Sequence, residues 1–326
     1  MGIAALLTAL ATGTALSAGT SMGSTTKADK PRRGEAGSWR RAAPMLHARS
    51  AHAVVSSNGN IYALAGSGAG GPVLAVERYD GKRWVDETTL PGGGLNAPAA
   101  VALNGLIYVI GGFEGVGNVP TNAVHAYDPT TRRWRDAAPL PAPRGGHAAV
   151  TLAGKIHVFG GGNSASTIAD HSVYDAVADS WAAAAQLPRA EGSPAAVVFR
   201  GRIYSVGGRS GSSDFGAVDI YDPASDTWGR GPRVGPRGTA GAVVYRSAVY
   251  LFGGESQSRG RTLSDVLRLD PKTNSWRRVS RMPTARNYAR AVLLNDAVYV
   301  VGGSRVAGAS HSSAGSKVVE RFFVRR

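Results

Sequence analysis

Six residues of this 326-residue chain share one repeated position, and most of them are arginines. The position lies 17 residues before each recurring glycine, and it is occupied by Arg49, Leu95, Arg144, Glu191, Arg237 and Arg286. Arg189 lies two residues before Glu191. Guanidinium groups gathered around one opening would focus positive potential and suit a carboxylate or phosphate. We therefore predict that the five arginines bind an acidic ligand. The alternative is a structural role, in which each arginine hydrogen-bonds neighbouring loops.

Other chemistry-bearing residue types are sparse. The chain has no cysteine, which excludes a disulfide, a thiolate metal site and a cysteine nucleophile. It has seven histidines without ligand spacing, and His52 and His147 share a register three residues after the repeated arginine position. We expect structural histidines, no metal and no cofactor. No phosphate-binding loop or catalytic triad pattern is present.

The charge balance favours acidic partners. Lysine and arginine number 37 against 22 aspartate and glutamate, so the formal net charge is +15. The partner predicted from this charge is an acidic small molecule, a glycan or a protein surface. Nucleic acid is not expected, because no aromatic platform or nucleic-acid-binding module accompanies the charge. We expect a monomer.

Three series of residues repeat with one period of about 47 residues, a period typical of propellers and solenoids. The tryptophans are Trp39, Trp84, Trp134, Trp181, Trp228 and Trp276. The glycine pairs are Gly111-Gly112, Gly160-Gly161, Gly207-Gly208, Gly253-Gly254 and Gly302-Gly303, with Ala65-Gly66 in the first repeat. An aromatic-Asp pair such as Tyr127-Asp128 forms the third series.

Each period contains four short strand patterns. In the second repeat they are Ala99–Leu103, Leu106–Ile110, Ala123–Tyr127 and Arg132–Arg135, and Asn104-Gly105 predicts a hairpin between the first two. Four antiparallel strands repeated radially predict an all-β fold, a single six-bladed β-propeller spanning residues 37–326. The last repeat has no tryptophan strand. The strand around Trp39 is therefore expected to complete the sixth blade and close the ring.

These repeat marks resemble the Kelch family, whose members include binding modules and enzymes. Galactose-oxidase-type copper chemistry is excluded, because it uses a tyrosine crosslinked to cysteine. Glu255 and Arg261-Thr262 after Gly254 are similar to bacterial Kelch sialic acid mutarotases (N-acetylneuraminate epimerases). That resemblance implies Glu255 as the acid/base for sugar ring opening and Arg261 as the carboxylate ligand. A solvated loop charge is the other interpretation of Glu255.

Three functions follow as hypotheses. The leading one is an exported Kelch binding module for an acidic ligand, the second is a sugar mutarotase, and the third is a structural envelope protein without a small-molecule site. Export is predicted from the apolar N-terminus, with residues 1–18 as a signal peptide and 19–36 as a linker. The apolar run is short and interrupted by threonines, so no stable membrane span is expected.

Overall fold

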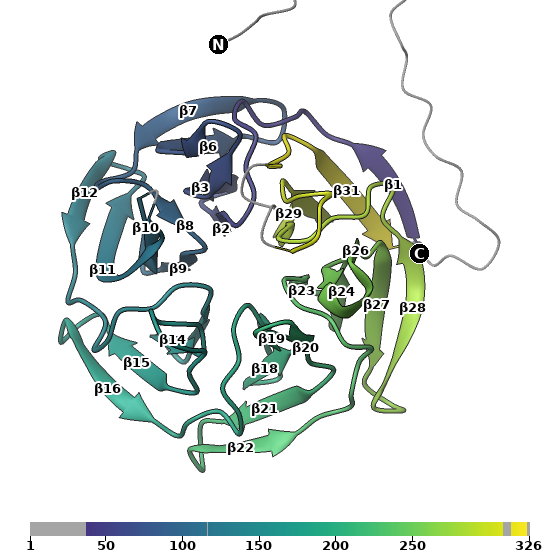
Figure 1. Cartoon of the computed structure of the whole chain (residues 1–326). Coiled ribbons are helices and arrows are strands. Elements are labelled where there is room, and N and C mark those ends of the chain that lie inside the picture. The colour runs from purple at the N-terminus through teal and green to yellow at the C-terminus, as the bar shows by residue number, and fades with distance from the viewer. Residues whose placement is uncertain (1–36, 116, 309–313, 325–326) are drawn as a thin grey trace, which may run out of the picture.

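The computed structural model describes residues 37–308, except 116, and residues 314–324. These residues form a ring of six antiparallel sheets around a central axis (Figure 1). The prediction of an all-β, six-bladed propeller is confirmed. The signal peptide and linker predicted for residues 1–36 lie outside the described residues. Within the described part, no helix is long and apolar enough to span a bilayer.

The four strands of each blade run from the axis outwards. Blades 1 to 3 contain β2 (Ala53–Ser57), β3 (Asn60–Leu64), β6 (Ala75–Tyr79) and β7 (Trp84–Thr89); β9 (Ala99–Leu103), β10 (Leu106–Glu114), β11 (Val119–Asp128) and β12 (Arg133–Asp136); β13 (Ala148–Leu152), β14 (Lys155–Phe159), β15 (His171–Asp175) and β16 (Ser180–Ala184). Blades 4 to 6 contain β17 (Ala195–Phe199), β18 (Arg202–Val206), β21 (Val218–Asp222) and β22 (Thr227–Arg230); β23 (Gly241–Tyr245), β24 (Ala248–Phe252), β27 (Asp265–Asp270) and β28 (Ser275–Arg281); β29 (Arg290–Leu294), β30 (Ala297–Val301), β31 (Val319–Val324) and β1 (Gly37–Arg41).

Shorter elements lie in the loops beyond these strands. They are β8 (Leu95–Asn96), which pairs with the extended end of β10, the hairpins β4 (Ser67–Gly68) with β5 (Gly71–Pro72), β19 (Arg209–Ser210) with β20 (Ser213–Asp214) and β25 (Glu255–Ser256) with β26 (Arg261–Thr262), and the 3-10 turn η1 (Gln257–Arg259). We call the side of the ring that carries these elements the loop face. The opposite side, which carries the tight turns between the first two strands of each blade, is the hairpin face.

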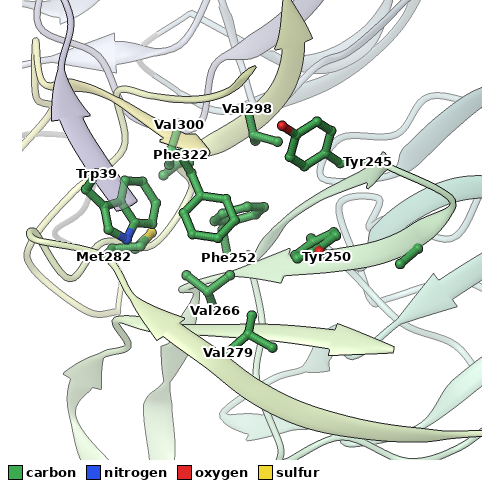
Figure 2. Close-up of a cluster of buried hydrophobic side chains, with 12 residues drawn as sticks. Trp39, Tyr245, Tyr250, Phe252, Val266, Val279, Met282, Val298, Val300 and Phe322 are labelled. Carbon is green, nitrogen blue, oxygen red and sulfur yellow. The ribbon is translucent and has the colours of Figure 1, made fainter. Parts of the chain in front are cut away.

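The chain ends meet in blade 6, as the repeat phase predicts. Strand β1 pairs antiparallel with β31, with Trp39 opposite Phe322. The indole Nε1 of Trp39 donates to Ser280 Oγ of blade 5 at 3.0 Å. The Trp39 and Phe322 rings pack with Phe252 between blades 5 and 6 (Figure 2). The N-terminal strand therefore fills the place of the missing last strand and covers a sheet edge.

Tryptophan recurs because it joins neighbouring blades on the outside of the ring. Each indole packs between blades and donates to an oxygen of the preceding blade or the loop that follows it, for example Trp181 to the Ala138 carbonyl at 2.8 Å and Trp228 to Ala185 at 2.8 Å. A large ring fills the gap that widens with radius, and its N–H needs a buried acceptor.

The glycine pairs join the blades nearer the axis. The second glycine of each pair donates its N–H to the carbonyl of the repeated-position residue in the next blade, as Gly254 does to Arg286 at 3.0 Å. The first glycine has positive φ, and a Cβ on Gly253 would lie 2.6 Å from that same Arg286 oxygen. Glycine at 253 meets both requirements, although Ala65 adopts the same backbone conformation at this position in blade 1.

Candidate functional site

The arginines at the repeated position are built into the blades. They are 0 to 5% exposed, and burial lowers the pKa of each guanidinium: Arg49, Arg144, Arg237 and Arg286. In blade 6, Arg286 Nη1 donates to the carbonyl oxygens of Gly302 (2.7 Å) and Val318 (2.9 Å), and Nη2 donates to Glu320 Oε2 (2.8 Å). In blade 1, Arg49 likewise reaches Ala65 O and Glu77 Oε1.

This placement corrects the expectation of an arginine ring around an open mouth. Each of the four guanidinium groups points into its own blade and donates to the carbonyl of the first residue in the glycine pair. In Arg49 and Arg286, backbone carbonyls and buried carboxylates use up the donors that a ligand would need. Arg144 pairs with the half-exposed Asp170, and Arg237 donates to the Gly235 and Gly253 carbonyls. The geometry is that of the structural alternative, in which these groups hold the loops of the blade together.

Blade 4 reverses the charge at this position and compensates for it. Glu191 is 1% exposed and accepts from Ser205 Oγ at 2.6 Å. Burial raises the pKa of Glu191 to about 6. Arg189 supplies the missing cation, with Nε 3.4 Å from Glu191 Oε2 and Nη2 bonded to the buried Asp219. Arg189 therefore also serves the blade rather than an open site.

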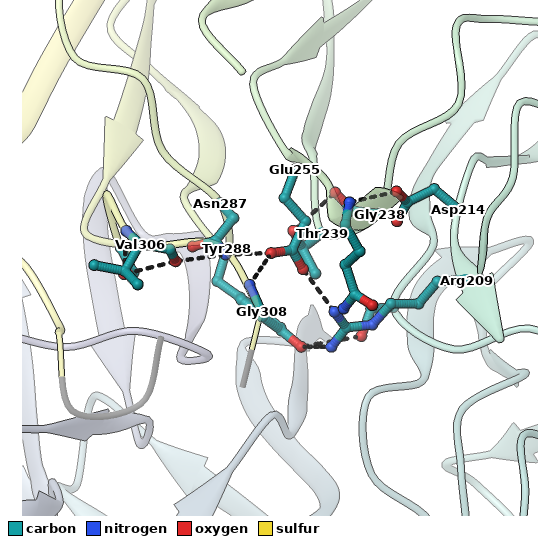
Figure 3. A network of polar contacts seen from close by, with 12 residues as sticks. Arg209, Asp214, Gly238, Thr239, Glu255, Asn287, Tyr288, Val306 and Gly308 are labelled. Carbon is teal, nitrogen blue, oxygen red and sulfur yellow. Dashed lines mark hydrogen bonds and ion pairs between the residues drawn. The ribbon is translucent and has the colours of Figure 1, made fainter. Parts of the chain in front are cut away.

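A polar network joins blades 4, 5 and 6 on the loop face (Figure 3). Glu255 is fully buried; its Oε1 accepts from Arg209 Nη1 at 2.6 Å. Its Oε2 accepts from Asn287 Nδ2 at 2.7 Å and from the N–H of Gly308 at 2.8 Å. Arg209 Nη2 donates to the Tyr288 hydroxyl at 2.6 Å. Glu255 stood out in the sequence, whereas Arg209, Asn287 and Tyr288 were missed.

Tyr288 lies across the loop-face end of the central channel. It is 3% exposed and packs with Ala51, Ala97 and Phe113 of blades 1 and 2, while its hydroxyl meets Arg209 of blade 4. The φ of Tyr288 is 48°, a conformation that an aromatic residue rarely adopts. The equivalent residues of the other blades, such as Ala51 and Thr239, also have positive φ, so this is a feature of the repeat. From this position the side chain reaches across the axis from blade 6 to blades 1, 2 and 4.

Glu255 and Arg261 do not converge on one pocket. In the β25–β26 hairpin Glu255 is opposite Thr262, and Arg261 is opposite Ser256. Adjacent residues of a strand point to opposite sides, which separates the two side chains. Glu255 is buried under Arg209, whereas Arg261 is exposed to solvent. The geometry implied by the mutarotase resemblance, with both residues on one sugar, is absent from the described residues.

Exposed arginines instead lie on two adjacent loops of the loop face, Arg259 and Arg261 on blade 5 and Arg305 on blade 6. We call Arg259, Arg261 and Arg305 the arginine edge; all three are exposed. Thr262 Oγ1 donates to the Arg305 carbonyl at 3.3 Å and so brings the two blades together. None of the three has a carboxylate within ion-pair distance among residues 37–308 and 314–324. Val306 beside them is 44% exposed.

The buried histidines have structural surroundings. His157 and His171 are hydrogen-bonded at 3.0 Å, and His171 Nδ1 donates to the Ala185 carbonyl at 3.1 Å. In the neutral form His171 Nε2 is then an acceptor, so His157 Nδ1 donates to it. Burial lowers the pKa of each to about 4. No group of three metal-ligating side chains occurs in the described part of the chain.

One further arginine lies in the central channel and was missed. Arg290 begins β29, four residues after Arg286, and it lines a cavity of about 170 Å³. The equivalent residues of the other five blades are Ala53, Ala99, Ala148, Ala195 and Gly241. The sequence signal was therefore available, as a single arginine in a register otherwise occupied by the smallest residues.

Comparisons with known proteins agree with the architecture. The KLHDC2/KLHL20/DRC7 Kelch-repeats domain matches residues 97–303, more than half of the chain. Beta-scruin of Limulus polyphemus is 33% identical over 131 residues, covering 38% of this chain and 14% of its own length. Human Kelch-like protein 23 is 34% identical over 130 residues, covering 39% and 23%. The chain thus spans less than a quarter of these relatives.

The solved structure of YjhT has the same fold. It superimposes with a TM-score of 0.73 at 17% sequence identity and covers 85% of this chain and 95% of its own. The repeat marks, the closed six-bladed ring and the matching family domain lead to one conclusion: this chain belongs to the Kelch-repeat family.

Proposed function

We propose that this chain is a protein-binding module that recognises an acidic surface through the arginine edge of Arg259, Arg261 and Arg305. Kelch propellers are typically protein-binding modules. The observation that carries the acidic preference is that these three arginines are exposed on two loops that touch at Thr262 and Arg305, without carboxylate partners among the described residues. Unpaired arginines on one edge attract and orient an acidic partner.

A protein surface fits this edge better than a glycan does. Val306 is a large exposed apolar side chain next to Arg305, and protein interfaces combine arginines with apolar contacts. The buried network of Glu255, Arg209 and Asn287 lies directly beneath and fixes the two loops. The edge is thereby held in place before a partner arrives, which lowers the entropic cost of binding.

The test compares two variants of equal charge. Arg259→Gln, Arg261→Gln and Arg305→Gln together remove the arginine edge. Arg133→Gln, Arg230→Gln and Arg277→Gln remove three exposed arginines from the outer strands of blades 2, 4 and 5. Binding to a polyglutamate peptide, with heparin as the acidic glycan, is measured by titration at two salt concentrations.

The edge variant is expected to lose at least about tenfold in affinity for the peptide, because several charge-assisted contacts disappear. The control variant should lose little, and salt should weaken the wild-type complex. Equal losses in the two variants would show that net charge alone drives binding. Tighter binding of heparin than of the peptide, lost in the edge variant, would favour a glycan ligand.

We further propose that the protein acts outside the cytoplasm, on the basis of the apolar run from Ile3 to Ala18 followed by a polar segment. Mass spectrometry of the secreted or envelope-associated protein should find a mature N-terminus between Gly19 and Gly37. An intact Met1 on cytosolic protein would exclude export.

A further inference from the structure

The central channel has two parts that differ in character. Near the loop face lies the cavity of about 170 Å³ lined by Arg290, His147 and the small first residues of the innermost strands. Further along these strands lies a second cavity of about 360 Å³, lined mainly by valines such as Val101, Val150 and Val198. Val54, Ala100 and Ala291 line both cavities, so the two adjoin.

Arg290 is the one charged group among the described residues that line the smaller cavity. Its Nε donates to the His52 carbonyl of blade 1 at 3.0 Å. Neither terminal nitrogen has a hydrogen-bond or ion-pair partner among residues 37–308 and 314–324. Burial, and then the charges of Arg144 and Arg290, lower the pKa of His147 on blade 3 across the ring. The guanidinium of Arg290 therefore lies in the channel rather than against its own blade.

Arg290 is half-buried, and a guanidinium held largely away from bulk water is costly unless water in the channel or an anion satisfies it. Burial also lowers the pKa of Arg290, because removing the cation from water favours its neutral form. The five other blades contribute alanine or glycine at this register, and these residues leave room beside the charge. The channel therefore offers free, directed donors to a small anion.

The two ends of the channel determine how such an anion would lie. Tyr288 lies across the loop-face end, and its hydroxyl accepts from Arg209. The other end is lined by apolar side chains, with Leu293 38% exposed there. A ligand entering from the hairpin face would pass along the valines before reaching Arg290.

We propose that the channel binds a short linear monocarboxylate, with its carboxylate on the free Nη1 and Nη2 of Arg290 and its alkyl chain along Val101, Val150 and Val198. A guanidinium binds a carboxylate through two parallel hydrogen bonds. The valine-lined part stabilises the alkyl chain by removing it from water. This site is separate from the arginine edge, and neither proposal depends on the other.

The test is calorimetric titration of the full chain with acetate, butanoate and hexanoate, using hexanol and chloride as comparison ligands. Hexanoate should bind at one site, more tightly than acetate, and hexanol and chloride should bind far more weakly. Arg290→Gln should weaken hexanoate at least about tenfold, the usual effect of losing a charge-assisted contact. Arg290→Lys should retain part of the affinity.

Two matched variants separate the role of Arg290 from the effects of net charge and of channel volume. Arg230→Gln removes the same charge from an exposed outer strand and should leave hexanoate binding unchanged. Ala100→Leu fills the channel where the two cavities meet and should block binding although Arg290 is intact. No saturable hexanoate binding, equal binding of chloride and hexanoate, or unchanged affinity in Arg290→Gln would overturn the proposal.

Discussion

Arg286 and Arg290 are four residues apart in blade 6, yet their guanidinium groups have opposite surroundings. Arg286 is fully buried in the blade wall and donates to two backbone carbonyls within 3.0 Å and to Glu320. Arg290 lies in the channel, and its guanidinium has one hydrogen bond to the described residues, from Nε. An arginine whose nitrogens already have hydrogen-bond partners belongs to the scaffold, whereas one with free nitrogens can bind a ligand, and both kinds occur near the axis.

The largest effect is expected in the blade wall. Arg286→Ala leaves Glu320 as a buried, unpaired carboxylate and should lower the free energy of unfolding by about 3–5 kcal/mol. Arg144→Ala should cost less, because Asp170 is half-exposed and water can solvate it. Urea denaturation measures both variants. Similar small losses of unfolding free energy in the two variants would contradict a stabilising role for the buried Arg286–Glu320 ion pair.

A second large effect concerns the neutral histidine pair of blade 3, whose rings pack against Tyr221 of blade 4 rather than in the channel. The folded pKa values of about 4 lie below the ordinary 6.5, so the unfolded chain takes up protons first as pH falls. The neutral histidine pair contributes its full stabilisation above pH 6.5. The free energy of unfolding should fall by about 2–4 kcal/mol as the pH drops towards 4.

This pH effect is measured as a difference between variants. Unfolding free energies of the wild type and of His157→Gln with His171→Gln are compared from pH 7 to pH 4. The double variant should show a shallower loss. His47→Gln, a change at an exposed histidine, should follow the wild type. Parallel curves for all three proteins would exclude the pair as the source.

Blade 4 offers a smaller effect with the opposite sign. The pKa of Glu191 is raised to about 6, so folding favours its protonated form, and the ionised form destabilises the protein as pH rises from about 4.5 past 6. Glu191→Gln retains an acceptor for Ser205 and should stabilise the protein by about 1–2 kcal/mol at pH 8. At pH 4 the gain should vanish, whereas Glu320→Gln should destabilise at pH 8. Thermal melts at both pH values decide this.

The smallest effect is expected in the channel. Arg290→Gln removes no ion pair among the described residues, so unfolding free energy should change by less than about 1 kcal/mol in either direction. Chemical denaturation beside Arg286→Ala measures the contrast directly. A loss as large as that of Arg286→Ala would assign Arg290 to the scaffold and remove the distinction between the two regions.

The architecture could be predicted from the sequence alone, because each repeat places the same residue types at equivalent positions. The tryptophan spacing and the hairpin turns predicted six blades, and the repeat phase assigned the strand around Trp39 to blade 6, where Trp39 lies opposite Phe322. Strand bounds differed by a few residues, and β10 and β11 extend beyond the predicted ranges into the loop face. These properties depend on short-range pattern and on closure of a sheet edge.

The availability of each arginine to a ligand, in contrast, depends on the folded ring. The register of Arg49, Arg144, Arg237 and Arg286 is visible in the chain, but the direction of each side chain depends on carbonyls and carboxylates that the folded blade brings to it. Arg290 stands out in the sequence against five small residues, yet its lack of partners for Nη1 and Nη2 among the described residues emerges only when the blades surround it. The repeat pattern shows which residues occupy equivalent positions around the ring, whereas their hydrogen-bond partners are atoms distant in the sequence.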